Sequence, residues 1–579
     1  MSNDEVRRGQ GQHRSKIANG DRLTALGQAI DGRPVADAAG RPKLQSHRRR
    51  RRPWIGRSLL AVGVVAVVLL TGVGADYIYL GSLLHHKDVK HLQSSGATEN
   101  ILLIGSTTRC GLRVQNAAYG LCSQGVTGVN SDIDMIVHLD LSSGTVSLLS
   151  IPRDLFVPNA RTTGANKIDA ALYQGPSQLV AAIEEDFAIP INHYVELNFD
   201  TFANVVDALG GVRMYFPVPL FDQYSGLNIK QSGCYLLDGV HALRVVRSRH
   251  LQYQTNSSDT NVATWPHEAL SDLARIRRTH EFLRVIAAKV AARGIGNPIT
   301  DQNIATSVLP FLTVDSGFSE SHMVSLAQTF SGTKISNIPQ FTFPVIQVET
   351  GSYLYQGYYY GDVEFPVQPD ALDVVHRLFG VAANANSFTY QPLPSPSSFS
   401  LSVENGTGIA NQATSVARQL TRAGFKAAAS GNVTPVGTVG ETVVWYGGPP
   451  PPPAGNWKSP SQAAAQVVLQ QLQGPAILGY DPSHVTAGAL VTLQTGTGLT
   501  VESTTRPTSS RPTTTTPSAT PTTSPGVTSS TVFDPPGIKS NNLFSAPSAV
   551  NSTLEPWDPR ACNAAGTGPA VVAKPQSSG

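Results

Sequence analysis

Cysteine and charged residues are both scarce in this chain of 579 residues. Four cysteines cannot form the dense disulfide framework of a small secreted scaffold, and no Cys-x-x-Cys pair is present for a structural zinc or a redox centre. Charged residues make up 14% of the chain and hydrophobic residues 41%, which is enough apolar material for packed cores and excludes a fully disordered chain. Stability must therefore come from ordinary hydrophobic cores.

Three common catalytic signatures are also missing. The sequence contains no Walker loop, no Gly-x-Ser-x-Gly elbow and no His-Glu-x-x-His helix. The most frequent classes of NTPase, serine hydrolase and metalloprotease are therefore disfavoured.

Positive charge is concentrated at the N-terminus. Residues 1–57 carry 14 Lys and Arg against 5 Asp and Glu, a net charge of +9, whereas the rest carries 29 against 35, a net charge of −6. The basic charge is thus a terminal feature, and the sequence predicts no nucleic-acid-binding face.

One apolar segment follows this basic region. Residues 58–74 contain no charged residue, and the stretch extended to Leu80 is long enough to cross a membrane. The 57 mostly polar residues before it argue for an anchor rather than a cleaved signal peptide, which stays the alternative. The arginine run 48–52 predicts that the N-terminus is cytoplasmic and that everything after residue 80 lies outside the cell membrane. We expect residues 1–52 to be disordered, 53–80 to span the membrane and 81–97 to be a linker.

The next part of the chain alternates strand and helix patterns. Residues 100–105 form a short apolar run, and the strand patterns at 134–141 and 145–151 flank a Ser-Ser-Gly turn, which predicts a hairpin. Amphipathic spacing predicts helices at 177–187, 202–209 and 274–292. The sequence therefore predicts a layered α/β domain with a mixed sheet over residues 98–380.

A Pro/Ser-rich linker at 381–398 leads to a small α/β domain at 399–498. Its expected elements are strands at 401–403, 442–446 and 489–493 and helices at 410–422 and 463–472. Residues 499–579 are expected to be a disordered tail, since residues 502–531 are almost only Thr, Ser and Pro.

Arginine and aspartate stand at the ends of several apolar runs. Asp132 and Asp134 open one strand, Arg153 follows another, and Arg247 and Arg249 follow the apolar run 242–246. Arginines beside a carboxylate suit a pyrophosphate and a divalent metal ion. For any single residue a structural ion pair is the alternative.

Five long segments resemble the LytR-CpsA-Psr family of cell-wall glycopolymer ligases, and mycobacterial CpsA-type members most of all. The segments are NILLIGSTTR, SDIDMIVHLDLSSGTVSLLSIPRDLFVP, NKIDAALYQGPSQLVAAIEEDFAIPINHYVELNFDTFANVVDALGGV, LLDGVHALRVVRSRH and DLARIRRTHEFL. They cover about residues 99–292. Residues 401–493, which open on Val-Glu-Asn-Gly-Thr-Gly, resemble the LytR C-terminal domain.

The resemblance implies a phosphotransferase that acts outside the membrane on a polyprenyl-pyrophosphate-linked glycan. The acceptor would be peptidoglycan, at the muramic acid 6-hydroxyl, and the glycopolymer would be arabinogalactan-like in a mycobacterium. The pyrophosphate-binding residues that it implies are Arg109, Arg153, Lys167, Arg247, Arg249 and Arg275. Asp132 maps onto a metal carboxylate for Mg²⁺, Arg153 is expected to be catalytic, and Asp132 and Asp134 are the candidate general bases.

Two departures from the family pattern concern the metal site. The family has a carboxylate where Thr107 stands, and a glutamine where Thr279 stands. Mg²⁺ binding should therefore weaken unless Asp134 substitutes or the pyrophosphate supplies most of the oxygen ligands.

Two further expectations concern the surroundings of the site. Cys110 and Cys122 flank an insertion on the oxidising side of the membrane, which suggests a disulfide, whereas the pairing of Cys234 and Cys562 is open. The three predicted helices could line an apolar groove for the prenyl chain, with ordinary core packing as the alternative.

Two other functions use the same residues. The chain could be a non-catalytic scaffold that binds lipid-linked glycan and cell wall, which Thr107 favours. It could also be a pyrophosphatase that releases the lipid carrier with water as acceptor. The retained basic positions favour the transferase.

Overall fold

The computed structural model describes residues 82–502, 554–562 and 572–573, with gaps at 111–120, 126, 270, 293–305, 307–308, 331, 335–337, 349–352 and 435–439. The expected cytoplasmic segment and membrane helix lie outside the described residues. Among the helices that the structure does describe, none is long and apolar enough to cross a membrane.

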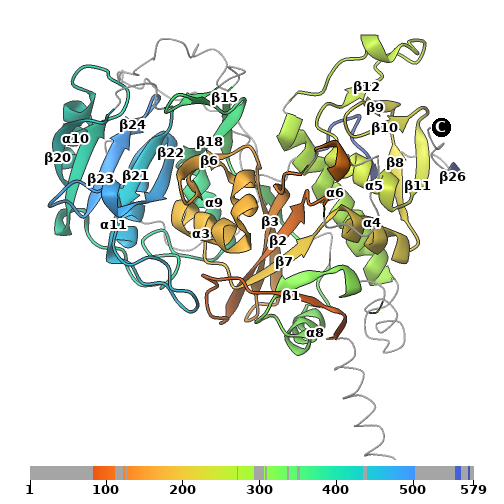
Figure 1. Cartoon of the computed structure of the whole chain (residues 1–579), viewed down its shortest axis with the longest axis horizontal. Helices are drawn as coiled ribbons and strands as arrows, with labels where there is room; N and C mark the ends of the chain where they lie inside the picture. The colour runs from red at the N-terminus through yellow and green to blue at the C-terminus, as the bar shows by residue number, and fades with distance from the viewer. Residues whose placement is uncertain are drawn as a thin grey trace, which may run out of the picture. The chain divides into compact units, whose positions relative to one another are not determined.

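A seven-stranded mixed sheet forms the centre of the first domain (Figure 1). Its strands, in spatial order, are β1 (His85–Lys87), β13 (Thr313–Asp315), β7 (His193–Leu197), β2 (Thr98–Ser106), β3 (Ser131–Asp140), β4 (Thr145–Ile151) and β14 (Gln340–Thr342). The predicted hairpin is confirmed, because β3 and β4 pair antiparallel and Gly144 adopts the left-handed conformation in the turn.

Helices cover both faces of this sheet. One face carries Leu102, Ile136 and Tyr194 into the main hydrophobic core, where α3 (Pro176–Phe187) and α9 (Asp370–Leu378) also contribute residues. The other face carries Ile101 and Val137 against α8 (Glu320–Thr329). The predicted layered α/β architecture is thus confirmed for the described residues.

Three helices pack beyond the sheet edge. They are α4 (Phe199–Ala208), α5 (Gly239–Arg247) and α6 (Ser271–Ala292). Gly239 sits at the first position of α5, where a Cβ would lie 2.2 Å from the carbonyl oxygen of Ala203 on α4. Only glycine permits this approach. The close contact fixes the position of α5 and therefore of Arg244 and Arg247 in its last turn.

Short strands complete this region. One sheet has the order β25 (Arg560–Ala561), β8 (Val212–Phe216), β11 (Gly233–Leu237) and β26 (Val572–Ala573), and another has the order β10 (Leu227–Ile229), β9 (Leu220–Asp222) and β12 (Gln252–Tyr253). Two hairpins stand apart, β5 (Phe156–Arg161) with β6 (Gly164–Lys167), and β16 (Leu354–Tyr355) with β17 (Tyr358–Tyr359).

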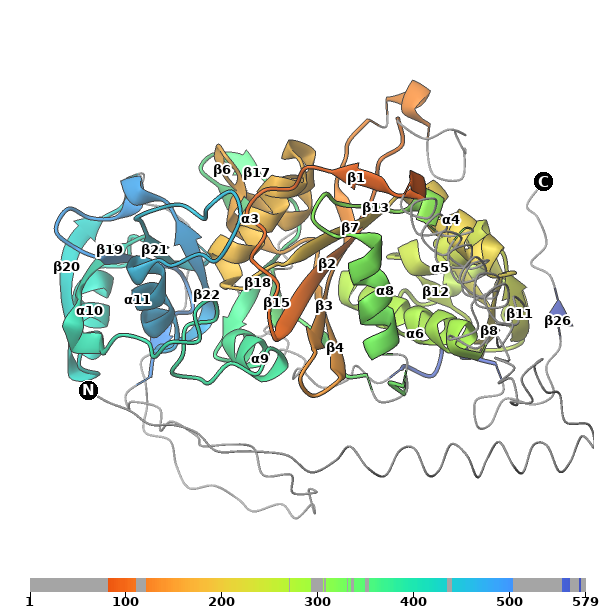
Figure 2. The same cartoon turned by 90° about the horizontal axis from the view of Figure 1, so that it is seen from below.

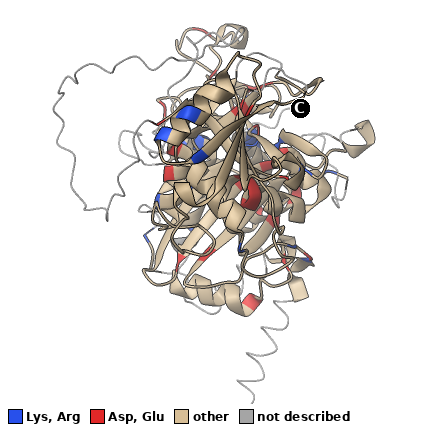
Figure 3. Ribbon diagram, turned by 90° about the vertical axis from the view of Figure 1, so that its left-hand side faces the viewer, with Lys and Arg blue, Asp and Glu red and all other residues tan. Residues whose placement is uncertain are grey.

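The second large sheet joins the two domains. Its order is β15 (Val345–Val348), β18 (Val363–Gln368), β22 (Leu472–Tyr480), β21 (Thr442–Tyr446), β23 (Val491–Thr495), β19 (Ser400–Asn405) and β20 (Lys426–Asn432), and β24 (Thr500–Val501) also pairs with β22. Helices α10 (Gln412–Arg422) and α11 (Pro460–Leu469) belong to the same domain. Figure 3 views the molecule from the left-hand side of Figure 1, where α10 and α11 lie, and most of the ribbon seen from there belongs to uncharged residues.

Three segments differ from the expected linkers and tail. In the segment 81–97, β1 pairs with β13 and Gln93 donates to buried Glu184. In the segment 381–398, Asn386 donates to buried Gln462. In the expected tail, residues 554–562 pack on the first domain because Asp558 is buried beside arginines of α6 and β25 pairs with β8.

Candidate active site

A cavity of about 760 Å³ lies beside the ends of β2 and β3. Gly105 and Ile133 form part of its floor, and a Cβ on Gly105 would lie 3.1 Å from the Ile133 side chain. Helices α4, α5 and α6 supply the opposite wall. The cavity therefore lies between the central sheet and the three helices.

The wall of the cavity is mostly apolar. Its hydrophobic lining residues from the three helices are Phe199, Phe202, Val205, Val206, Leu243, Val246, Phe282, Leu283 and Ile286. The helices predicted at 202–209 and 274–292 thus line the cavity, as does α5. The helix predicted at 177–187 does not line it, because the apolar residues of α3, such as Leu179 and Ile183, pack in the main core.

Five arginines line the same cavity: Arg109, Arg153, Arg247, Arg249 and Arg275. The family resemblance predicted all five to bind pyrophosphate, and the structure brings them together at one cavity. Lys167 is not among the lining residues, because its ammonium group binds the carboxylate of Asp154 at 2.9 Å.

Arg153 is held by three carboxylates. It forms an ion pair with Asp132, and its guanidinium lies 3.8 Å from Asp154 and 3.5 Å from Asp169. Burial alone would lower the pKa of Arg153, but the three carboxylates together raise it above its usual range. Arg153 is therefore a fixed positive charge.

Arg249 and Arg275 share the buried carboxylate of Asp272. Arg275 binds it through two hydrogen bonds of 2.9 and 3.2 Å, and the Nε atom of Arg249 lies 3.3 Å from it. Burial opposes ionisation of Asp272, but the two arginines lower its pKa. The carboxylate thus fixes both guanidinium groups at the cavity wall.

Arg109 and Arg247 lie over one aromatic ring. Their guanidinium carbons are 5.4 and 4.4 Å from the ring centroid of Phe199. Burial, followed by the proximity of Arg247, lowers the pKa of Arg109. Two cations held this close suit a ligand that carries more than one negative charge.

The two candidate bases occupy different places. Asp132 lines the cavity, whereas Asp134 is 1% exposed and does not reach it. Burial raises the pKa of Asp134 to about 8, against a hydrogen bond from Ser131. Because Asp134 does not line the cavity, this geometry does not support the prediction that it acts as a base or metal ligand.

Thr107 is bound to a neighbouring loop. Its hydroxyl accepts a hydrogen bond from the backbone N–H of Asn130 at 2.9 Å and donates to the carbonyl oxygen of Gly128 at 3.3 Å. Thr107 therefore shapes the cavity wall without adding a charge.

The structure forms the disulfide between Cys110 and Cys122 and also pairs Cys234 with Cys562. Cys122 of the first disulfide lies three residues before Gly125, which lines the cavity. The second joins β11 to the returning tail segment.

Several residues that organise the site were not predicted from the sequence. Asp272 stands three residues before Arg275 on α6, and this spacing was an available signal. Asp222 binds the Ser248 hydroxyl at 2.6 Å and the backbone N–H groups of Arg249 and His250 at 3.0 Å. No local sequence pattern predicts such a contact, because Asp222 and Ser248 are 26 positions apart in the chain.

Two family models match the chain. The model described as the LytR_cpsA_psr family matches residues 81–364, and the model described as LytR cell envelope-related transcriptional attenuator matches residues 398–498.

The curated relatives include proteins of Corynebacterium and Bacillus. A probable cell wall biosynthesis protein LcpB of Corynebacterium glutamicum is 32% identical over 314 residues, 53% of this chain and 69% of the relative. Cell wall biosynthesis protein LcpA of the same species is 24% identical and covers 69% of this chain and 81% of its own length. The polyisoprenyl-teichoic acid–peptidoglycan teichoic acid transferase TagT of Bacillus subtilis is 32% identical over 28% of this chain and 47% of its own length.

Among solved structures, a LytR-Csp2A-Psr enzyme from Actinomyces oris is 24% identical over 45% of this chain and 87% of its own, with a TM-score of 0.37.

Proposed function

The chain belongs to the LytR-CpsA-Psr family, and on that basis we propose that it is a phosphotransferase that attaches a cell-wall glycopolymer to peptidoglycan. In this reaction the acceptor hydroxyl attacks the glycan-linked phosphorus of a polyprenyl pyrophosphate. The bond to the bridging oxygen breaks, the glycosyl phosphate moves to the acceptor, and polyprenyl phosphate leaves. The names of the Bacillus relatives, which describe transfer of polyisoprenyl-linked teichoic acid to peptidoglycan, support this class of reaction.

The observation that carries the proposal is the combination of five arginines with an apolar wall in one cavity. Phosphoryl transfer requires positioning and charge neutralisation more than a protein nucleophile. The guanidinium groups would bind the pyrophosphate oxygens, and α4, α5 and α6 would bury prenyl carbons at about 0.8 kcal/mol for each CH₂. A soluble phosphorylated substrate would have no need of that wall.

The acceptor and the glycan are finer parts of the proposal. We assign the muramic acid 6-hydroxyl as acceptor and an arabinogalactan-like polymer as donor glycan. Asp132 is the only acidic side chain among the described residues that line the cavity, so it is the group placed to accept the hydroxyl proton. Its ion pair with Arg153 orients the carboxylate.

The donor set suits a Mg²⁺ ion that is held mainly by the substrate. Asp132 is the protein ligand that would hold it, since Asp134 is buried and the Thr107 hydroxyl is engaged with backbone. Mg²⁺ commonly uses one or two carboxylates together with phosphate oxygens and water. When bound, the ion would neutralise charge on the pyrophosphate.

A single assay separates this proposal from its alternatives. The full chain in detergent is given a synthetic lipid-pyrophosphate glycan and a peptidoglycan oligomer, and products are identified by mass spectrometry. The transferase yields glycan joined to peptidoglycan through a phosphodiester, together with polyprenyl phosphate. Glycosyl phosphate released to water would indicate the pyrophosphatase, and substrate binding without any product would indicate the scaffold.

We also propose that the chain is anchored once in the cell membrane, with residues 1–57 cytoplasmic and the described domains outside. The arginine run before the apolar segment supports this orientation. A reporter that is active only in the cytoplasm, fused after Leu80, should be inactive. Activity in that fusion would reverse the proposed topology.

A further inference from the structure

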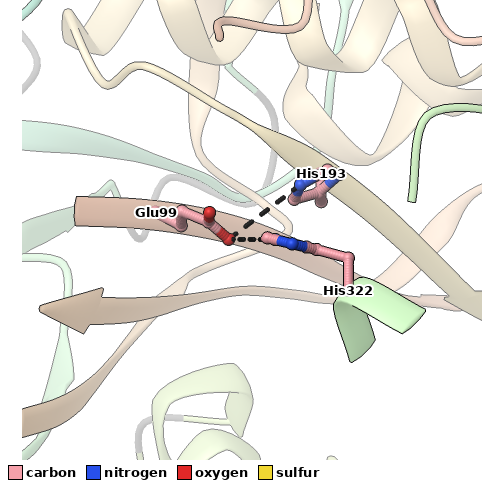
Figure 4. A group of neighbouring side chains, drawn as sticks. All are labelled: Glu99, His193 and His322. Carbon is pink, nitrogen blue, oxygen red and sulfur yellow. Dashed lines mark hydrogen bonds and ion pairs between the residues drawn. The ribbon is translucent and has the colours of Figure 1, made fainter. Parts of the chain in front are cut away.

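A cluster of two histidines and one glutamate lies on the central sheet away from the cavity (Figure 4). Glu99 belongs to β2, His193 to β7, and His322 to α8, so residues far apart in sequence meet at one place. The Oε2 atom of Glu99 lies 2.9 Å from Nε2 of His322 and 4.0 Å from Nε2 of His193. One ligand atom from each residue lies within 4.8 Å of the other two.

We propose that Glu99, His193 and His322 bind a divalent transition-metal ion, and that Zn²⁺ is the ion that the site fits best. Two imidazoles and one carboxylate are a ligand set that zinc uses with water in the fourth position. Zinc–ligand distances of about 2.0–2.2 Å require tetrahedral ligand atoms to lie about 3.4 Å apart. The two separations from Glu99, 2.9 and 4.0 Å, bracket this value, and the third pair lies within 4.8 Å, so small side-chain rotations would close the site.

The residues around His193 hold its ring in the orientation that metal binding requires. Its Nδ1 atom lies 3.2 Å from the carboxylate of Asp315, and the ring stacks on Phe318 with centroids 4.2 Å apart. Asp315 is itself fixed, because it accepts hydrogen bonds from the backbone N–H groups of Tyr194 and Gly317. A carboxylate on Nδ1 keeps the proton there and leaves the Nε2 lone pair directed at the metal.

An ion can reach the site from solvent. The side chain of His322 is 31% exposed, whereas those of Glu99 and His193 are 2% and 8% exposed. The hydroxyl of exposed Ser95 lies 3.1 Å from Nε2 of His193. Buried ligands with one open side are typical of a site that binds an ion from solution.

A metal at this position would tie α8 to the sheet. In Figure 2, α8 runs beside β2 and β3, and its Leu326 packs in the same apolar cluster as Val314 of β13. Glu99 and the cavity residue Gly105 lie six positions apart on β2, or about 20 Å along the strand. The proposal concerns a second site and does not depend on the proposed reaction.

The test uses the full chain, stripped of metal with a chelator and free of any affinity tag, titrated with Zn²⁺ by calorimetry. We expect one bound ion for each chain and at least about 100-fold weaker binding for His322→Ala and for Glu99→Gln. Asp315→Asn should weaken binding by about 10–100-fold, because it removes the group that orients His193. His86→Ala, an exposed histidine on neighbouring β1, is the matched control and should bind as the unchanged chain does.

Two further measurements keep the result interpretable. Circular dichroism establishes whether each variant is folded, and His322→Ala alters a partly exposed position on α8. Zn²⁺ should raise the melting temperature of the unchanged chain and not that of His322→Ala. Absence of a bound ion, or equal affinity in His322→Ala, would show that the cluster is only a hydrogen-bonded polar network and would overturn the proposal.

Discussion

Arg153 combines two roles that the sequence presented as alternatives. It lines the cavity, and it also balances Asp132, Asp154 and Asp169. The same dual role holds for Arg249 and Arg275 through Asp272. Ion pairing therefore does not argue against ligand binding here, because the carboxylates position the cations.

Arg153→Ala should reduce the transfer rate by about 10²–10³-fold, since a charge-assisted contact that strengthens in the transition state is worth about 2–4 kcal/mol. It should also lower the free energy of unfolding, because three carboxylates lose their partner. Single-turnover kinetics on folded protein separates the two effects. Arg284→Ala, which breaks a more exposed pair with Glu281 on α6, is the control and should retain full activity. Full activity in Arg153→Ala would show that the reaction does not take place in this cavity.

Thr107→Asp should tighten Mg²⁺ binding by placing a second carboxylate in the cavity with Asp132. The new side chain can still accept from the backbone N–H of Asn130 but can no longer donate to Gly128, so a small loss of stability is expected. Titration calorimetry with Mg²⁺ measures the gain. Thr107→Asn has the same shape without the charge, and equal affinities in the two variants would contradict a metal site here.

At the scale of whole elements, the sequence predicted α3, α4, α6 and the β3–β4 hairpin because long periodic patterns identify them. It gave no indication of the strands β8 to β12, which are two to five residues long and have little periodicity. The returning segment at 554–562 was also missed. Its placement depends on contacts with residues more than 200 positions away, which local patterns cannot reveal.

This returning segment should contribute strongly to stability. Asp558 is fully buried and pairs with Arg277 at 2.5 Å, and it lies 3.8 Å from fully buried Arg278. Asp558→Asn should therefore destabilise the fold, by up to about 3–5 kcal/mol, since it leaves two buried arginines to share the single carboxylate of Glu268. Urea unfolding measures this cost. Asp481→Asn, at an exposed pair with His484, is the control, and an equal effect of both substitutions would contradict the assigned role.

Helix α3 predicts a pH dependence of stability. Burial raises the pKa of Glu185 from its ordinary value of about 4.5 to about 8, so between these values the folded chain holds a proton that the unfolded chain has released. The contribution of Glu185 to the free energy of unfolding is fully present below about pH 4 and is lost as the pH rises through 8. Glu185→Gln should reduce the loss of unfolding free energy between pH 5 and 8. An unchanged pH profile in this variant would show that the carboxyl is ionised in the fold.

At the scale of the whole molecule, the two domains share a hydrophobic core and a sheet and are not separate bodies on a linker. Val443, Trp445 and Ile477 of the C-terminal domain belong to the main core of the first domain. Strand β18 pairs with β22 at Val367 and Gln368. Part of the predicted linker at 381–398 packs at this junction, because Ala385 belongs to the main core and Phe388 to the core of the C-terminal domain.

The shared core predicts that residues 82–502 unfold as one unit. Asn159 of the first domain and Tyr480 of the second exchange two hydrogen bonds, of 2.7 and 2.8 Å, and the Tyr446 hydroxyl donates to the carbonyl oxygen of Glu185. Opening the junction would expose these groups together with Trp445, so neither domain gains by unfolding alone. Tryptophan fluorescence and far-ultraviolet circular dichroism should therefore give coincident urea transitions. Tyr446→Phe, which removes one junction hydrogen bond, should shift both transitions together by about 1 kcal/mol. Two separated transitions in the unchanged chain would show that the junction is weaker than its buried contacts imply.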